Sequence, residues 1–136
     1  MKVAVLKGGR SLERQVSLRS GARVEDALAS LGHEPVALDA GADLVRRLKE
    51  ERPEAAFIAL HGPGGEDGTV QELLEILSIP YTGPGVAACI RSMDKVLAKH
   101  EMRAAGIATP DWVAFNQTAF GAVSYTHLTL PTTPYV

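Results

Sequence analysis

A glycine-rich stretch at residues 59–68, with the sequence ALHGPGGEDG, gathers several chemically active side chains in one place. It holds an imidazole, His61, and two carboxylates, Glu66 and Asp67, among four glycines. Glycines let backbone amides approach a ligand closely. The stretch follows an apolar run and precedes a helical pattern, so we expect a strand-to-helix turn, where α/β proteins bind ligands. The alternative is a plain glycine-rich connector with solvated acids.

A second turn of this kind, residues 7–13, follows the first apolar run and contains Glu13. Turns after parallel strands lie at one edge of the sheet, so Glu13 and His61 are expected to face one crevice. A carboxylate suits an ammonium group, and an imidazole with helix-terminal amides suits a carboxylate. The pair could therefore hold a zwitterion such as an amino acid. The alternatives are a first-turn acid favoured by the helix dipole and a histidine tied to the turn backbone.

Apolar runs alternate with helical patterns along the first part of the chain. Strands are predicted at residues 3–6, 36–38 and 55–60, and helices at residues 11–31, 44–48 and 70–77. Residues 79–83 are expected to form a short fourth strand or an extended link. Such βαβ units close right-handed. We therefore predict an α/β fold, a Rossmann-like parallel sheet with helices on both faces.

Serine and glycine residues mark the expected helix ends. Ser11 and Ser92 are candidate N-caps, and Gly32 and Gly106 are candidate stops. After a helix ending near Gly106, residues 110–115 are expected to enter a new unit as a strand.

The chain is expected to contain a first domain at residues 1–93 and the start of a second at 94–121. Residues 122–136 carry no charged side chain and are rich in Thr, Pro and Tyr. Part of this segment resembles the translation of a sequencing adapter, so we interpret it as a non-native tail and leave it out of the fold argument. A genuine extended tail is the alternative.

The bulk composition excludes several function classes. The formal charge of −2 over 136 residues gives no electrostatic reason to expect nucleic acid or an anionic membrane as a partner. The single cysteine, Cys89, forbids an internal disulfide and fits a reducing cytoplasm. We find no signal peptide and no apolar run near the roughly 20 residues that span a bilayer. The glycines match neither a dinucleotide fingerprint nor a P-loop, and no Cys/His cluster has metal-ligand spacing.

Four motifs together carry a resemblance to a known family. They are GGRSLERQVSL at residues 8–18, FIALHGPGGEDG at 57–68, PYTG at 80–83 and SMDK at 92–95. In this order and spacing they resemble the N-terminal portion of the D-alanine–D-alanine ligases, members of the ATP-grasp superfamily. The resemblance extends from Lys2 to about Phe115.

The resemblance implies an enzyme of the bacterial cytoplasm that makes D-alanyl-D-alanine for peptidoglycan. ATP phosphorylates the carboxylate of one D-alanine, and the amine of a second attacks the acyl phosphate. Residues 1–93 would be the pre-ATP-grasp domain and residues 94–121 the start of the ATP-grasp domain. The family is usually dimeric through its N-terminal domain.

The resemblance also implies roles for four side chains. Glu13 would be the catalytic residue and would hold the ammonium of the first D-alanine. His61 would bind the same substrate near its carboxylate. Ser17 would support Glu13 within the substrate site. Lys95 would contact the phosphates of ATP, although the residues alone indicate only a solvated helix lysine.

The remaining ATP-clamping lysines, an arginine and the Mg²⁺ ligands are expected in parts of the family that follow Phe115. The chain as given is therefore expected to be inactive. Two alternatives stay open: a stand-alone amino-acid-binding module without catalysis, and a ligase relative that uses D-lactate or D-serine as the second substrate.

Overall fold

The computed structural model describes residues 1–114 as a parallel sheet with helices around it. The strands are β1 (Lys2–Lys7), β2 (Glu34–Asp39) and β3 (Ala55–Ile58). The helices are α1 (Arg14–Ser30), α2 (Leu44–Glu51), α3 (Thr69–Ile76), α4 (Val86–Met93) and α5 (Lys95–Ala104). The tail predicted at residues 122–136 lies outside the described residues.

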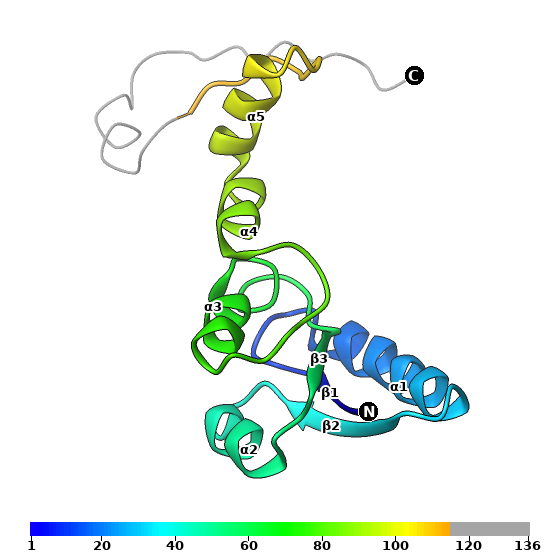
Figure 1. Cartoon of the computed structure of the whole chain (residues 1–136). Helices are drawn as coiled ribbons and strands as arrows, with labels where there is room; N and C mark the ends of the chain where they lie inside the picture. The colour runs from blue at the N-terminus through cyan, green and yellow to red at the C-terminus, as the bar shows by residue number, and fades with distance from the viewer. Residues whose placement is uncertain (115–136) are drawn as a thin grey trace.

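The sheet has the order β2-β1-β3, and both pairs of strands are parallel. In β1, Val5 is in register with Ala37 on one side and Phe57 on the other. The central strand is thus paired along both edges, with α1 on one face of the sheet and α2 and α3 on the other (Figure 1). This arrangement confirms the expected α/β fold with helices on both faces.

The alternating side chains of β1 supply both halves of the core. Ala4 and Leu6 pack in a cluster that includes Leu48 of α2 and Leu74 of α3. On the other face, Lys7 lies against Gly21 of α1, and a Cβ added at that glycine would lie 2.5 Å from the Lys7 Cδ. A fully buried leucine contributes about 1.5–3 kcal/mol relative to an exposed one. The sheet is therefore held from both sides by apolar burial.

The predicted helix stops are confirmed. Gly32 has φ of +78°, its N–H donates to Ala29 O at 3.0 Å, and His33 N–H donates to Leu28 O at 3.0 Å. This is the Schellman arrangement, in which a left-handed glycine satisfies the last carbonyls of a helix. Gly106 ends α5 in the same way, with φ of +72°.

The predicted N-caps are wrong. Ser11 lies outside the first turn of α1; its hydroxyl accepts from Glu13 N–H at 3.1 Å and donates to His61 O at 2.8 Å. Ser92 lies inside α4, where the backbone is already helical, so it cannot cap α5. Asp94 takes that position, and its carboxylate accepts from Val96 N–H at 2.8 Å and from Leu97 N–H at 3.0 Å.

The segment at residues 79–83 is an extended link with one parallel bridge, between Ala56 and Tyr81. Ala56 donates to Pro80 O at 2.8 Å and accepts from Thr82 N–H at 3.1 Å. One step further, Ile58 N–H donates to the hydroxyl of Thr82 at 3.1 Å. A side chain has replaced the backbone partner there, so no regular fourth strand forms.

The strand expected at residues 110–115 is absent from its described part, 110–114. That segment folds back on α5 instead. The ammonium of Lys99 donates to Pro110 O at 2.7 Å and lies 5.1 Å from the centre of the Trp112 ring. The Arg103 guanidinium lies 4.3 Å from the same ring and pairs with Asp111 at 2.6 Å.

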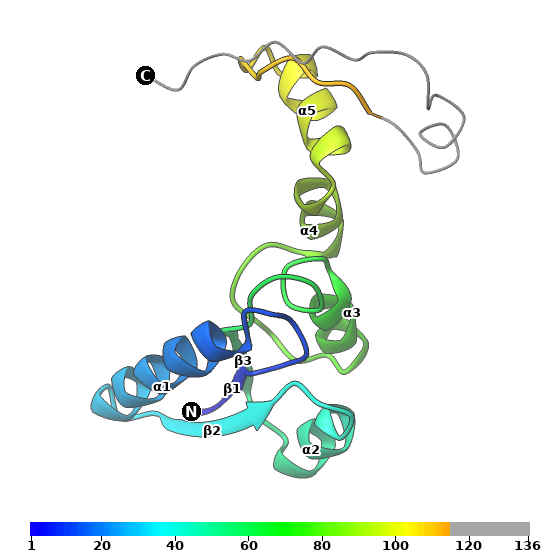
Figure 2. The same ribbon diagram turned by 180° about the vertical axis from the view of Figure 1, so that it is seen from behind.

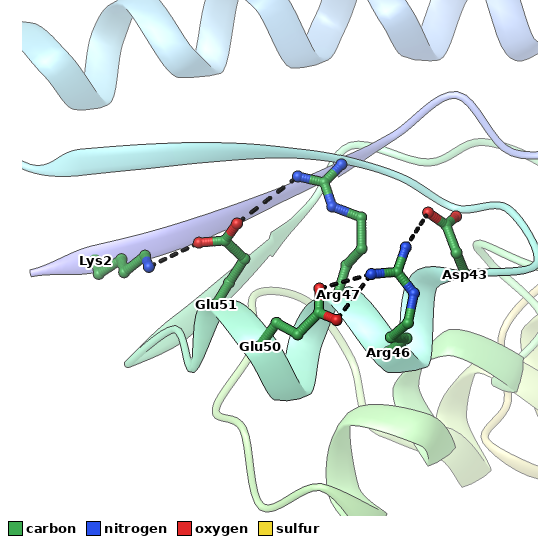
Figure 3. Close-up of polar contacts among 6 residues, drawn as sticks. All are labelled: Lys2, Asp43, Arg46, Arg47, Glu50 and Glu51. Carbon is green, nitrogen blue, oxygen red and sulfur yellow. Dashed lines mark hydrogen bonds and ion pairs between the residues drawn. The ribbon is translucent and has the colours of Figure 1, made fainter.

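Ion pairs run along α2 and join it to β1 (Figure 3). Arg46 bridges Asp43 and Glu50 along the helix. Lys2 of β1 reaches Glu51 at 2.8 Å, which lowers the pKa of that carboxyl. Solvent-accessible pairs of this kind contribute about 0–1 kcal/mol each. They therefore add little to the stability of the fold.

Helices α4 and α5 extend away from the sheet in both views (Figures 1 and 2). No residue of α5 is buried. Within residues 1–114, no helix is long and apolar enough to cross a membrane.

Candidate functional site

The connections of the sheet run in opposite directions on the two sides of β1. The chain leaves β1 through α1 to β2 on one side, then crosses through α2 to β3 on the other side of β1. Such a reversal of direction is a topological switch point, where open α/β sheets bind ligands at the carboxyl ends of the strands. The turn after β1 carries Glu13, and the turn after β3 carries His61.

An ion pair ties down the turn that leads to Glu13. The guanidinium of Arg14 pairs with Asp39 at the end of β2 at 2.9 and 2.5 Å, and also donates to Gly9 O at 3.0 Å. Gly9 N–H donates to Asp39 at 3.1 Å. The hydrogen bond from Arg14 lowers the pKa of Asp39 despite the opposing effect of burial. A Cβ at Gly8 would lie 2.6 Å from both charged groups, so glycine lets the pair close over the turn.

Glu13 is exposed and precedes α1 directly. A Cβ added at Gly62 would lie 3.0 Å from the Glu13 Oε2 atom, so this carboxylate rests against the turn that contains His61. Its side chain makes no hydrogen bond or ion pair to any other described residue. The carboxylate is therefore available to a cationic group at the crevice.

The glycine-rich turn is held by its own acid. The carboxylate of Asp67 accepts from Gly64 N–H at 2.8 Å and from Thr69 N–H at 3.1 Å. Burial raises the pKa of Asp67, but these bonds outweigh it and the net pKa is lowered. Gly65 leaves no room for a side chain, because its Cβ would lie 2.5 Å from the Leu60 Cβ. Asp67 thus has a structural task in the turn.

His61 is about one-third exposed and lies between α1 and the glycine-rich turn. Its Nε2 atom lies 3.3 Å from the hydroxyl of Ser20 on α1. Its Nδ1 atom lies 3.7 Å from the carboxylate of Glu66. The Ser11 hydroxyl donates to the His61 backbone carbonyl at 2.8 Å. Both ends of the ring and the backbone behind it are therefore positioned by neighbours.

Ser17 is completely buried, so no ligand in the crevice can reach it in this structure. Its hydroxyl donates to Ala59 O at 2.7 Å and accepts from Gly8 N–H at 2.9 Å. These two bonds join the turn after β1 to the end of β3. The supporting role that the resemblance implies for Ser17 remains a prediction.

A cleft of about 480 Å³ opens beside His61. Its lining combines apolar and polar groups: Ile58, Leu60, His61, Gly65, Glu66, Gln71, Thr82, Gly83, Pro84, Cys89, Ser92 and Met93. Glu13 and Ser20 are not among them, so the cleft lies on the Glu66 side of the imidazole. Cys89 is buried, and its thiol donates to Pro84 O at 3.6 Å.

Lys95 is exposed at the first position of α5 and is not part of this cleft. The next backbone amides, of Val96 and Leu97, are occupied by Asp94. A phosphate near this helix would therefore meet the Lys95 ammonium rather than open helix-terminal amides. No group of three or more His, Cys, Asp or Glu residues within residues 1–114 could hold a metal ion.

The sequence analysis missed Ser11 and Ser20 as contributors to this site. A signal for Ser20 was present, because Ser17 and Ser20 are spaced i, i+3 and share one helix face. That face packs against the sheet at Gly21, so a polar pair on it needed partners.

Comparisons with known proteins find similar proteins over most of this chain. Residues 39–84 match a family described as "D-ala D-ala ligase N-terminus". A D-alanine–D-alanine ligase from Anaeromyxobacter dehalogenans is 51% identical over 122 residues, which are 90% of this chain and 40% of the relative. The chain is therefore similar to the N-terminal portion of the D-alanine–D-alanine ligases. D-alanine–D-alanine ligase B of Pseudomonas putida is 55% identical over 109 residues, 80% of this chain and 34% of the relative.

A solved ligase structure shows the same similarity to the D-alanine–D-alanine ligases. The D-alanine–D-alanine ligase of Bacillus anthracis, complexed with ATP, superposes with a TM-score of 0.76 at 34% identity. The match covers 92% of this chain and 45% of that structure. The chain thus spans about 40% of the length of the relatives it matches.

Proposed function

We propose that this chain is the first-substrate portion of an ATP-dependent ligase that joins two D-alanines into D-alanyl-D-alanine for peptidoglycan. In this proposal Glu13 binds the ammonium of the first D-alanine and His61 lies near its carboxylate. Ser17 supports Glu13 by holding the turn after β1 against β3. The proposal includes the cytoplasm as location, since the product serves cell-wall synthesis, and a homodimer in the full-length protein.

The observation that carries this proposal is the convergence of Glu13 and His61 from two different strand ends. A free carboxylate and an imidazole at one edge of the sheet offer opposite partners to the two ends of a zwitterion. The Glu13 carboxylate lies 3.0 Å from the Cβ position of Gly62, the residue that follows His61.

Lys95 is assigned to the phosphates of ATP, in line with the nucleotide in the Bacillus anthracis structure. Its ammonium has no hydrogen bond or ion pair to another residue within 1–114. Bound ATP would supply the phosphoryl group that activates the first carboxylate. The Mg²⁺ ligands and the groups that stabilise the transition state are assigned to later parts of the ligase, so this chain alone is expected to make no dipeptide.

A chimera tests the proposal. Residues 1–114 replace the matching segment of the Anaeromyxobacter dehalogenans ligase, and dipeptide and ADP are measured with D-alanine and ATP. The chimera should be active. Glu13→Gln should lower kcat/KM about 10- to 100-fold, because hydrogen bonds to charged groups contribute about 1.5–3 kcal/mol. Glu72→Gln, at an exposed acid of α3, should leave kcat/KM unchanged.

Two outcomes would refute the proposal. One is a folded but inactive chimera beside an active parent, which would favour a binding module without catalysis. The other is full activity of Glu13→Gln.

A further inference from the structure

We propose that Ser20 is a positioning residue that holds neutral His61 in the tautomer with its proton on Nδ1. The imidazole then presents an N–H donor to the cleft. Nothing in the four motifs or in the relatives' names assigns a task to this serine.

The first support is the pair of contacts at the two ring nitrogens. The Ser20 hydroxyl lies 3.3 Å from Nε2, and the Glu66 carboxylate lies 3.7 Å from Nδ1. An ionised carboxylate can only accept, so the nitrogen that faces it is favoured to carry the proton. The 3.7 Å separation exceeds a hydrogen bond, but the attraction between a polar N–H and a carboxylate persists at that distance.

The second support is the capacity of a hydroxyl to adapt. With the proton on Nδ1, Nε2 has a lone pair, and a serine hydroxyl can rotate to donate to it. The reverse tautomer would place a lone pair opposite the Glu66 carboxylate, which is unfavourable. Ser20 and Glu66 therefore favour the same tautomer from opposite sides of the ring.

The third support is that the backbone carrying the imidazole is held in place. Ser11 holds the backbone carbonyl of His61, and Ser17, one helical turn before Ser20, holds the carbonyl of Ala59. These bonds fix the distance between α1 and the chain leaving β3. The Ser20 hydroxyl therefore faces an imidazole whose backbone attachment is already held in place.

The consequence for ligand selection follows from the position of the cleft. His61 and Glu66 line the cleft, whereas Ser20 lies behind the ring on α1. The nitrogen nearer the cleft is then the donor Nδ1–H, which suits a ligand carboxylate or carbonyl oxygen. Identifying that acceptor as the carboxylate of D-alanine rests on the proposed function; the tautomer does not.

Nitrogen NMR of the ring tests the tautomer in the 136-residue chain. Two-bond proton–nitrogen spectra are recorded at pH 9, well above the ordinary imidazole pKa of about 6.5. His61→Asn identifies the ring signals, and His33 serves as an internal reference. We expect a pyrrole-like Nδ1 and a pyridine-like Nε2 in wild type. Ser20→Ala should shift both signals toward the averaged values of His33, and Ser20→Thr, which keeps the hydroxyl, should restore them.

Ser30→Ala is the matched control, since Ser30 is an exposed serine on the same helix and, within residues 1–114, its hydroxyl bonds only to Ala27 O. It should leave the ring signals of His61 unchanged. A wild-type ring protonated mainly on Nε2, or a Ser20→Ala ring identical to wild type, would overturn the inference. Because this readout needs no substrate, it is independent of the chimera assay, and either proposal can fail alone.

Discussion

Removing the Ser17 hydroxyl should destabilise the fold far more than its small size suggests. The side chain is completely buried, and its one oxygen serves two backbone groups, Ala59 O at 2.7 Å and Gly8 N–H at 2.9 Å. Ser17→Ala leaves both groups buried without this partner. Because each of the two groups costs about 1–3 kcal/mol, we expect the free energy of unfolding to fall by at least about 2 kcal/mol.

Urea unfolding of the chain, followed by circular dichroism, measures this loss. For small proteins the m-value in urea is about 1–3 kcal/mol/M, so with a value of about 2 kcal/mol/M the midpoint should fall by at least about 1 M, with the m-value unchanged. The variant should still fold, since domains of this size have about 5–15 kcal/mol of stability. Ser30→Ala on the same helix is the control and should change the free energy by less than about 0.5 kcal/mol.

The reasoning fails if Ser17→Ala matches this control. Such a result would mean that Ala59 O and Gly8 N–H gain other partners at no cost, and that Ser17 is not what joins the turn after β1 to the end of β3. A large loss with a changed m-value would instead indicate an altered denatured or native state.

Three further predictions follow from the site and its supports. Asp94→Ala should cost about 1 kcal/mol of local helix stability, seen as faster amide exchange in α5, whereas Ser92→Ala should leave exchange unchanged. Because the folded pKa of Asp39 is lowered, its stabilising contribution is present above the ordinary pKa of about 3.9 and is lost as pH falls through the folded value. Urea midpoints measured from pH 6 to pH 2 should therefore fall less steeply in Asp39→Asn than in wild type. Gly62→Ala and Gly64→Ala both place a side chain at positive φ, but only Gly62 has Glu13 near its Cβ position, so only Gly62→Ala should shift the carboxyl carbon signal of Glu13.

Periodicity and glycine placement were enough to predict much of the fold from the sequence. Apolar runs with intervening helical patterns gave the three strands in their correct places, and Gly32 and Gly106 end their helices as expected. These features are local: a left-handed residue is needed at each stop, and glycine adopts that conformation without strain.

The wrong predictions involve residues whose partners are distant in sequence. Serine is a common N-cap residue, yet the Ser11 hydroxyl donates to the backbone carbonyl of His61, 50 positions away. Ser92 also has the residue type of an N-cap, but it lies within α4, which continues to Met93. At residues 79–83 the sequence left a short strand and an extended link open. The extended link forms, because a threonine hydroxyl takes the place of a backbone partner at Ile58. None of these competitors is visible in a local window of sequence.

For the candidate site, the sequence could supply the charged groups but not the hydroxyls that hold them. Glu13 and His61 were predicted to share a crevice because turns after parallel strands lie at one edge. The strand order β2-β1-β3 makes those two turns neighbours, which the rule alone did not require. The three serines then act on one short segment: Ser17 on Ala59, and Ser11 and Ser20 on His61. A serine has no charge and little apolar surface to mark it in a sequence, so its contribution becomes visible only when helix α1 is seen against the end of β3. The position of the imidazole is thus set by hydroxyl groups on one helix and its leading turn, and this is why perturbing those serines is the sharpest test of how the site is built.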